Sequence, residues 1–188
     1  MESVGETYYP ERKDFAKEIK GKTLVQIYQQ YFLEQEDAQN AITKALADFE
    51  QKMSFAFIPG ALHFVASLRR HGFKVAVVTS SNQQKLKCLL NGTQFYSLFD
   101  RVFTAEDAAR SKPAPDCYLS AAASFGFEAT DCYVFEDSLN GLQAGLDSGA
   151  TVVGVATTYD AERIAPLCHH VIQDFTNFSV AAMGNLKK

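Results

Sequence analysis

The spacing of apolar residues divides the chain into a helical part and a mixed part. From about Glu11 to Met53, apolar positions recur every three or four residues, which predicts amphipathic helices and no strand. Thr23 precedes the run 24–32 and is a residue type that caps helix N-termini. The second helix is predicted to bury one face made of Ala38, Ala41, Ile42, Ala45, Leu46, Phe49 and Met53. We predict short antiparallel helices over residues 1–56.

After Phe57 helical segments alternate with short β-branched apolar runs. The pattern predicts helices between Gly60 and Gly72 and over 83–90, 115–125 and 140–148, and strands over 73–79, 102–104, 132–135, 151–155 and 171–172. Such alternation is typical of a parallel sheet covered by helices on both faces. We therefore expect residues 57–188 to form a Rossmann-like, three-layer α/β/α core.

Composition narrows the functional classes. The 188 residues are 47% hydrophobic and 21% charged, which is typical of a globular domain, and the net charge of −4 disfavours a nucleic-acid partner. No apolar run approaches the roughly 20 residues that span a bilayer, and the first residues lack a signal-peptide pattern. The four cysteines form no C-x-x-C pair. We expect a cytoplasmic protein with reduced thiols and no membrane partner, and its oligomeric state stays open.

Polar residues gather where the predicted strands end. Thr79, Ser80, Ser81 and Asn82 follow the strand 73–79, and Glu136 and Asp137 follow the strand 132–135. Lys112 lies in the loop that leads to the helix at Pro115. Alone, the first group could be a helix N-cap, the carboxylate pair a capping arrangement and the lysine a solvated loop residue.

The strand ends of a parallel sheet converge on one edge, where ligands bind. Hydroxyls, helix N–H groups and an ammonium suit a phosphate, and paired carboxylates suit Mg²⁺. Together these residues predict one phosphate-and-metal site.

Three segments carry a family resemblance: VVTSSN at 77–82, SKPAPD at 111–116 and VFEDSLNGLQAG at 134–145. They resemble motifs two, three and four of the haloacid dehalogenase (HAD) superfamily, within its group of β-phosphoglucomutase-like proteins and sugar-phosphate phosphatases. The resemblance implies that residues 1–56 form a helical cap over the core. It also implies a small phosphorylated metabolite as substrate and Mg²⁺ as cofactor.

The resemblance assigns roles to the strand-end residues. Thr79, with Ser80, Ser81 and Asn82 beside it, would bind the phosphoryl group, and Lys112 would neutralise the charge of phosphate and nucleophile. Glu136 and Asp137 would hold Mg²⁺ directly or through water. Ser138 and Asn140 would contact these side chains without binding the phosphoryl group or Mg²⁺ themselves.

The family's first motif, Asp-x-Asp, is absent from this sequence. In the family that motif supplies the nucleophile and the acid/base aspartate, and it follows a first strand that lies centrally in the sheet, between those ending at Thr79 and Phe135. No strand-like run precedes Glu11, so the first strand is expected to be missing. A start site placed too far downstream and a truncation are favoured over a true loss.

The resemblance implies a phosphatase that works through an aspartyl-phosphate intermediate. A β-phosphoglucomutase-type transfer is the runner-up, although the arginine that this branch places shortly after Lys-Gly-x-Ser/Thr is not found after Lys20-Gly21-Lys22-Thr23. Lys20 or Lys22 could take that arginine's part. A third reading, a catalytically inactive binding protein, follows from the missing nucleophile.

Overall fold

The computed structural model describes residues 19, 22–50, 56–90 and 95–186. The helices of eight or more residues are α3 Leu24–Tyr31, α4 Glu36–Glu50, α5 Ala61–Arg70, α6 Gln83–Leu90, α8 Asp116–Ser124 and α9 Leu139–Ser148. The shorter ones are α7 Phe95–Leu98, α10 Ala161–Ile164 and α11 Val180–Gly184, with 3₁₀ turns at Ala105–Asp107, Ala129–Asp131 and Ala165–Leu167. The strands are β1 Ala76–Val78, β2 Arg101–Phe103, β3 Tyr133–Glu136, β4 Thr151–Val155 and β5 His170–Ile172.

The strands form two parallel sheets. β1 pairs with β2, and β3, β4 and β5 pair in that order. Within the described ranges, no strand lies between β1 and β3.

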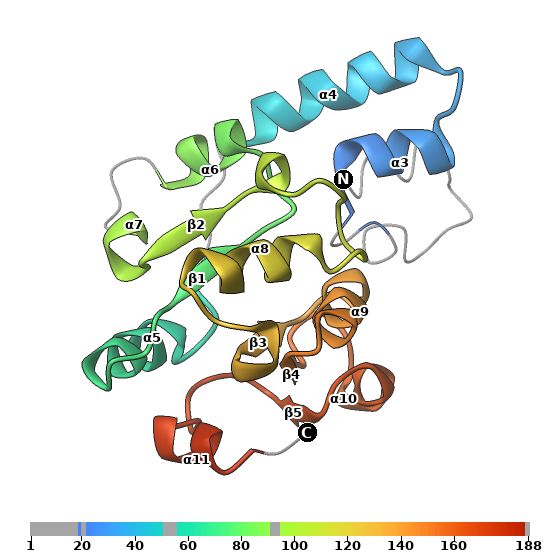
Figure 1. Ribbon diagram of the computed structural model, residues 1–188. Helices are drawn as coiled ribbons and strands as arrows, with labels where there is room; N and C mark the ends of the chain where they lie inside the picture. Colours follow the sequence, from blue (N-terminus) through green and yellow to red (C-terminus); the bar gives the residue numbers. More distant parts are fainter. Residues whose placement is uncertain (1–18, 20–21, 51–55, 91–94, 187–188) are drawn as a thin grey trace.

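The core has helices on both faces, as expected (Figure 1). Alternate residues of β3 face opposite layers: Val134 packs in a cluster with Leu142 of α9, whereas Phe135 packs with Phe64 of α5. α8 contacts α9 on the first face, and α11 contacts α5 on the second. This arrangement confirms the three-layer α/β/α fold.

α3 and α4 share a separate cluster away from the core (Figure 1). Thr23 caps α3 as predicted, because its hydroxyl accepts from the Gln26 N–H while the Gln26 side chain accepts from the Thr23 N–H. The predicted apolar face of α4 is only partly buried: Ala38 and Ile42 are covered, but Phe49 is 57% exposed. Ala41 and Ala45 are exposed as well. The cluster under α4 comes from α3 and its flanking residues, so it covers a narrower stripe than expected.

The strand 73–79 is shorter than predicted. Phe73 and Lys74 are exposed, and pairing with β2 covers Ala76–Val78 alone. The short helices α7, α10 and α11 were not predicted, because four or five residues carry too little periodicity to detect. Met53, Lys20 and the predicted helical stretch 11–18 lie outside the described residues.

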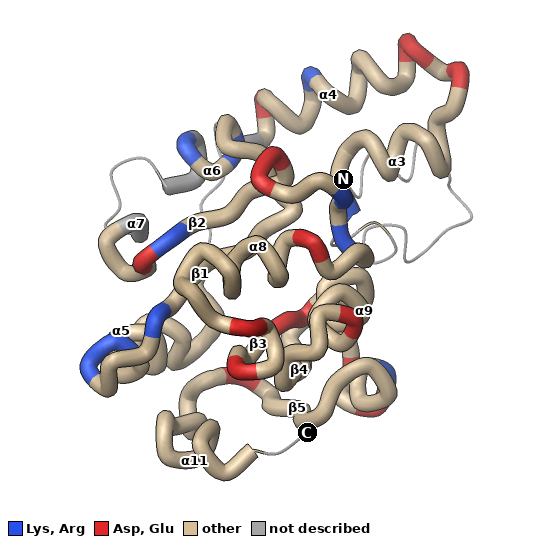
Figure 2. The backbone as a smooth tube through the Cα atoms, viewed as in Figure 1, with Lys and Arg blue, Asp and Glu red and all other residues tan. Residues whose placement is uncertain are grey.

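Among the described helices, none is long and apolar enough to cross a membrane. Figure 2 shows the Lys and Arg positions of this view spread over α4, α5, α6 and β2, with acidic positions between them.

Candidate active site

Lys112 joins the ends of β1 and β3. Its side chain is 4% exposed, and its ammonium donates to the Val78 carbonyl at 3.2 Å and to Glu136 Oε1 at 3.2 Å. It also donates to the Tyr118 hydroxyl at 2.8 Å and lies 4.7 Å from the centre of the Tyr118 ring. An ammonium has three N–H donors, so these three acceptors satisfy a buried cation completely. Lys112 therefore lies at the end of β3, as the sequence predicted.

Glu136 uses its second oxygen at the start of α9. Oε2 accepts from the Ser138 N–H at 3.2 Å and from the Ser138 hydroxyl at 3.0 Å. Ser138 in turn caps α9, since its hydroxyl oxygen accepts from the Gly141 N–H. A Cβ at Gly141 would stand 2.1 Å from the Glu136 carboxyl carbon, so glycine leaves the room that this carboxylate occupies.

Asp137 turns toward the end of β4. Its Oδ2 accepts from the Thr158 hydroxyl and, at 3.4 Å, from the Thr157 hydroxyl. The same rule that drew attention to Thr79 and Glu136, polar residues directly after a strand, would have found both threonines after β4. Asn140 is half-buried in the first turn of α9.

The residues after β1 form a tight turn. The Thr79 hydroxyl accepts from the Ser81 N–H at 3.1 Å, and the Ser81 carbonyl accepts from the Ala105 N–H. Asn82 Oδ1 accepts from the Lys85 N–H at 2.8 Å, which is a helix-capping contact on α6. Ser80 lies between them and is half-buried. The alternative interpretation of this group, a helix N-cap, therefore holds for Asn82. The Thr79 hydroxyl accepts a hydrogen bond within its own turn.

The sequence analysis did not identify Tyr118 or Gln26 as candidate site residues. Burial, with the Glu136 charge as a smaller cause, raises the pKa of the Tyr118 phenol well above its ordinary value, so it stays protonated beside Lys112. Gln26 of α3 donates from Nε2 to the Lys112 carbonyl at 2.8 Å and ties α3 to the loop that carries Lys112. Neither residue follows a strand, so only the tertiary contact identifies them.

The two carboxylates, those of Glu136 and Asp137, are ligands of the type that Mg²⁺ prefers. Mg²⁺ is commonly held by one or two carboxylates together with waters and substrate phosphate. The described residues contain no group of three or more His, Cys, Asp or Glu side chains placed to bind a metal. Glu136 accepts hydrogen bonds from Lys112 and Ser138, and Asp137 accepts one from Thr158, so both carboxylates stay candidate ligands.

Three cysteines and one histidine have structural surroundings. Burial raises the pKa of the Cys117, Cys132 and Cys168 thiols, which keeps them in the unreactive protonated form. His169, directly before β5, accepts at Nδ1 from the Val152 N–H at 2.9 Å and so bonds to the central strand β4. The Cys88 side chain lies outside the described part of the chain.

Comparisons with known proteins agree with these motifs. A validoxylamine A 7'-phosphate phosphatase from Streptomyces hygroscopicus subsp. limoneus is 32% identical over 108 residues, which are 57% of this chain and 51% of that protein. The chain spans about half the length, or less, of the first curated relatives that it matches.

Two solved structures share the fold. A HAD hydrolase from Entamoeba histolytica superposes with a TM-score of 0.81 at 22% identity, covering 96% of this chain and 86% of that one. A β-phosphoglucomutase from Clostridium difficile superposes with a TM-score of 0.73 at 16% identity, covering 97% and 85%. The family profile of haloacid dehalogenase-like hydrolases matches residues 2–155. The chain belongs to the haloacid dehalogenase-like hydrolase family.

Proposed function

We propose that this chain forms the phosphate- and metal-binding part of a Mg²⁺-dependent phosphatase that acts on a sugar or polyol phosphate. The observation that carries the proposal is the buried Lys112 ammonium, held by Glu136 at the meeting point of β1 and β3. A buried cation at a strand edge stabilises a transferring phosphoryl group more strongly than a solvated one. Relatives named as phosphatases of phosphorylated small molecules support this substrate class.

The residues of the site divide the work. Lys112 neutralises the phosphoryl oxygens, and Thr79 and the backbone N–H groups of the turn after β1 bind them. Asp137, steadied by Thr158, holds Mg²⁺, and Glu136 and Ser138 position Lys112 and the start of α9. Mg²⁺, when bound, adds charge neutralisation to the phosphoryl group. The sequence has no Asp-x-Asp, so the proposal assigns none of its residues as the acceptor of the phosphoryl group.

The helical segment 1–56 is proposed to act as the cap over the core 57–188. The Gln26 contact with the Lys112 carbonyl supports this role, because it links the two parts beside the site. Lys22 donates to Gln30 and Tyr31 within the cap at 2.6 and 3.3 Å. That engagement weakens Lys22 as the distal-phosphate ligand of a mutase and favours the phosphatase.

The test uses the protein isolated from its own cells. Its intact mass is compared with 20.8 kDa, and release of inorganic phosphate is measured with Mg²⁺ on a panel of sugar and polyol phosphates. We expect turnover that disappears on chelation. Transfer between hexose hydroxyls without phosphate release would assign the mutase instead, and no reaction would assign the inactive binding protein.

Variants test the site itself. We expect Lys112→Ala and Asp137→Ala to lower kcat by roughly 100-fold or more, because each removes a charge that acts on the phosphoryl group or its metal. Lys44→Ala, in the exposed face of α4, is the matched control and should keep the parent rate. The Tm of each variant separates a lost site from a lost fold.

A further inference from the structure

We propose that the apolar cavity beside β1 and β3 binds the acyl chain of a free, straight-chain fatty acid of medium length, with the carboxylate at Lys74. The cavity is separate from the candidate active site, because the residues that line it do not include Thr79, Lys112, Glu136 or Asp137. The proposal therefore goes beyond the proposed function and does not depend on it.

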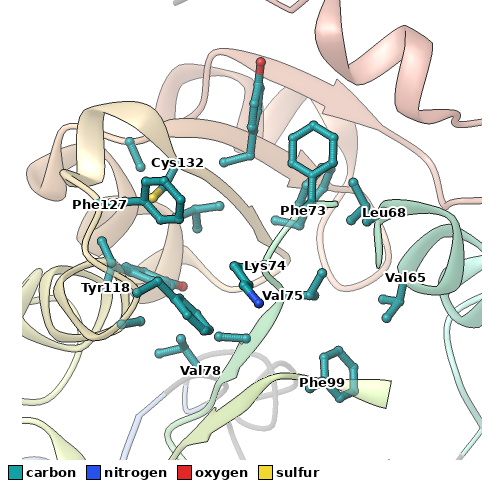
Figure 3. A pocket seen from close by; sticks show the side chains of 18 of the residues that line it. Val65, Leu68, Phe73, Lys74, Val75, Val78, Phe99, Tyr118, Phe127 and Cys132 are labelled. Carbon is teal, nitrogen blue, oxygen red and sulfur yellow. The ribbon is translucent and has the colours of Figure 1, made fainter. Parts of the chain in front are cut away.

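The lining of this cavity fits an apolar ligand. The cavity holds about 550 Å³, and side chains from α5, β1, α8, β3 and the segments before the two strands line it, nearly all of them apolar (Figure 3). Sites for small molecules are mostly apolar concavities of roughly 300–1,000 Å³ with a few polar groups that fix the orientation of the ligand. An empty apolar cavity also costs its lining dispersion contacts, which a hydrocarbon restores.

The exposure of the lining residues shows which end of the cavity faces solvent. Phe73 and Phe127, which precede β1 and β3, are 43% and 49% exposed. At the other end, Tyr118 is 8% exposed, and its hydroxyl accepts from the Lys112 ammonium. An elongated ligand therefore enters beside Phe73 and Phe127 with its apolar end first, and its polar end stays at the surface.

The strand beside the cavity sets the length of that ligand. Residues of β1 and the segment before it line the cavity from Lys74 to Val78. Four steps along a strand, at about 3.3 Å each, cover about 13 Å. An extended carbon chain advances about 1.3 Å per carbon, because tetrahedral angles shorten the projection of each bond of about 1.5 Å. A straight chain of about ten carbons fits this length.

Lys74 indicates the polar end of the ligand. Lys74 and Asp131 are the charged residues among those that line the cavity, and both are exposed. Lys74 and Arg69 each lie 3.9 Å from Asp100 Oδ1, so two cations share one carboxylate on the β1 side. Because such long, exposed pairs are weak, the Lys74 ammonium is available to a ligand carboxylate, which accepts a charge-assisted hydrogen bond.

The first test titrates the 188-residue chain with fatty acids of six to fourteen carbons, below their micelle concentrations, by isothermal titration calorimetry. We expect one-to-one binding whose affinity rises about fourfold per methylene. The increase should stop beyond about ten carbons, when the cavity is full. Decanoate should bind more tightly than decanol, and decylammonium more weakly than both, because Lys74 attracts the first head group and repels the last.

A charge variant locates the head group. Lys74→Gln should weaken decanoate about two- to fivefold, the range of an exposed ion pair, and should leave decanol binding unchanged. Lys87→Gln, on the exposed face of α6, is the matched control and should bind both probes as the parent does.

A size variant locates the acyl chain. Ala122 of α8 is 6% exposed and lines the cavity, so Ala122→Leu takes room from the ligand and should weaken decanoate about tenfold or more. Its Tm should equal or exceed that of the parent, since the new side chain fills a void. Ala47→Leu, on the exposed face of α4, should bind as the parent does. If Ala122→Leu does not fold, the chain-length series and Lys74→Gln still decide.

Several results would overturn the proposal: affinity that keeps rising beyond fourteen carbons, more than one bound acid per chain, decylammonium as the tightest ligand, or unchanged decanoate binding by a folded Ala122→Leu variant. Native mass spectrometry that shows a dimer unaffected by decanoate would assign the cavity to a second copy of the chain. Flotation with vesicles of phosphatidylcholine and phosphatidylglycerol, without binding of free decanoate, would assign it to membrane lipid. Both results contradict a site for a free fatty acid, and none of these measurements uses phosphatase activity.

Discussion

Lys112 and Glu136 form a buried pair whose remaining lone pairs and protons are also satisfied. Lys112 has Tyr118 and the Val78 carbonyl as further partners, and Glu136 has Ser138. A buried ion pair is tolerated only when its other hydrogen-bonding groups are met as well. Single partners of this network should therefore matter for stability even before any reaction is considered.

Tyr118→Phe tests one of these partners. The ring stays, but the Lys112 ammonium loses a hydroxyl acceptor, and we expect about 1.5–3 kcal/mol less stability. Urea unfolding measures the difference. Tyr133→Phe in β3 also removes a hydroxyl near the cavity but no partner of Lys112, and an equal loss there would contradict the role assigned to Tyr118.

Gly141→Ala tests the space left for Glu136. The new Cβ would lie 2.1 Å from the Glu136 carboxyl carbon, so the carboxylate must leave Lys112, at a cost of about 1–3 kcal/mol. In α11, a Cβ added at Gly184 would meet no heavy atom within 4 Å. Gly184→Ala should therefore be neutral or slightly stabilising. Thermal unfolding of the pair compares them, and similar losses would count against the crowding argument.

At the scale of elements, caps hold the loops that carry the site. Thr104 and Asp107 cap the 3₁₀ turn Ala105–Asp107, which comes between β2 and Lys112. Asp107 Oδ2 accepts from the Thr104 N–H and hydroxyl, both at 2.7 Å. These bonds, the backbone one first, lower the pKa of the Asp107 carboxyl below its ordinary value.

Asp107→Ala should therefore destabilise the protein in a pH-dependent way. The folded pKa is lowered, so the carboxylate's contribution is present above the unfolded pKa near 3.9 and is lost as pH falls through the folded pKa. We expect a loss of about 0.5–1 kcal/mol at pH 7 that shrinks as pH falls through the folded pKa. Urea unfolding at pH 7 and over a series of lower pH values checks this, and a pH-independent difference would contradict it.

At the scale of the molecule, a cluster of aromatic side chains on one face of the core links the two sheets. Phe64 of α5 lies 5.5 Å from Phe135 of β3, 5.3 Å from Phe175 and 5.2 Å from Phe178, measured between ring centroids. Val75, directly before β1, packs on the same cluster. Phe64 thus helps to join the two sheets without a shared strand.

Phe64→Ala should cost about 3–5 kcal/mol and should broaden unfolding, because it removes a buried ring from the cluster on which Phe135 of β3 and Val75, before β1, both pack. The control Phe49→Ala replaces a ring that is 57% exposed and should change stability by no more than about 0.5 kcal/mol. Tryptic digestion with mass mapping would show earlier cleavage around β1 in Phe64→Ala. Equal stability of the two variants would refute the bridging role.

Local patterns sufficed for the longer helices, for the approximate positions of the strands and for the position of most candidate residues. The N-cap at Thr23, the helix 83–90 and the strand 151–155 were predicted with their observed starts, because periodicity and capping act over a few residues. Thr79, Lys112 and Glu136 could be chosen because strands of a parallel sheet end at one edge. The motifs around them carried the family assignment.

The tertiary structure alone decided how these residues are partnered. Lys112 meets Glu136 from 24 positions away, and Thr158 meets Asp137 from 21 positions away, so no local pattern reports either contact. The missing first strand was inferred from the sequence through the family's order of strands. A cavity is lined by residues of β1, β3, α5 and α8, and its formation depends on packing across the whole core. Side-chain contacts between distant segments determine that packing, and a linear pattern does not encode it.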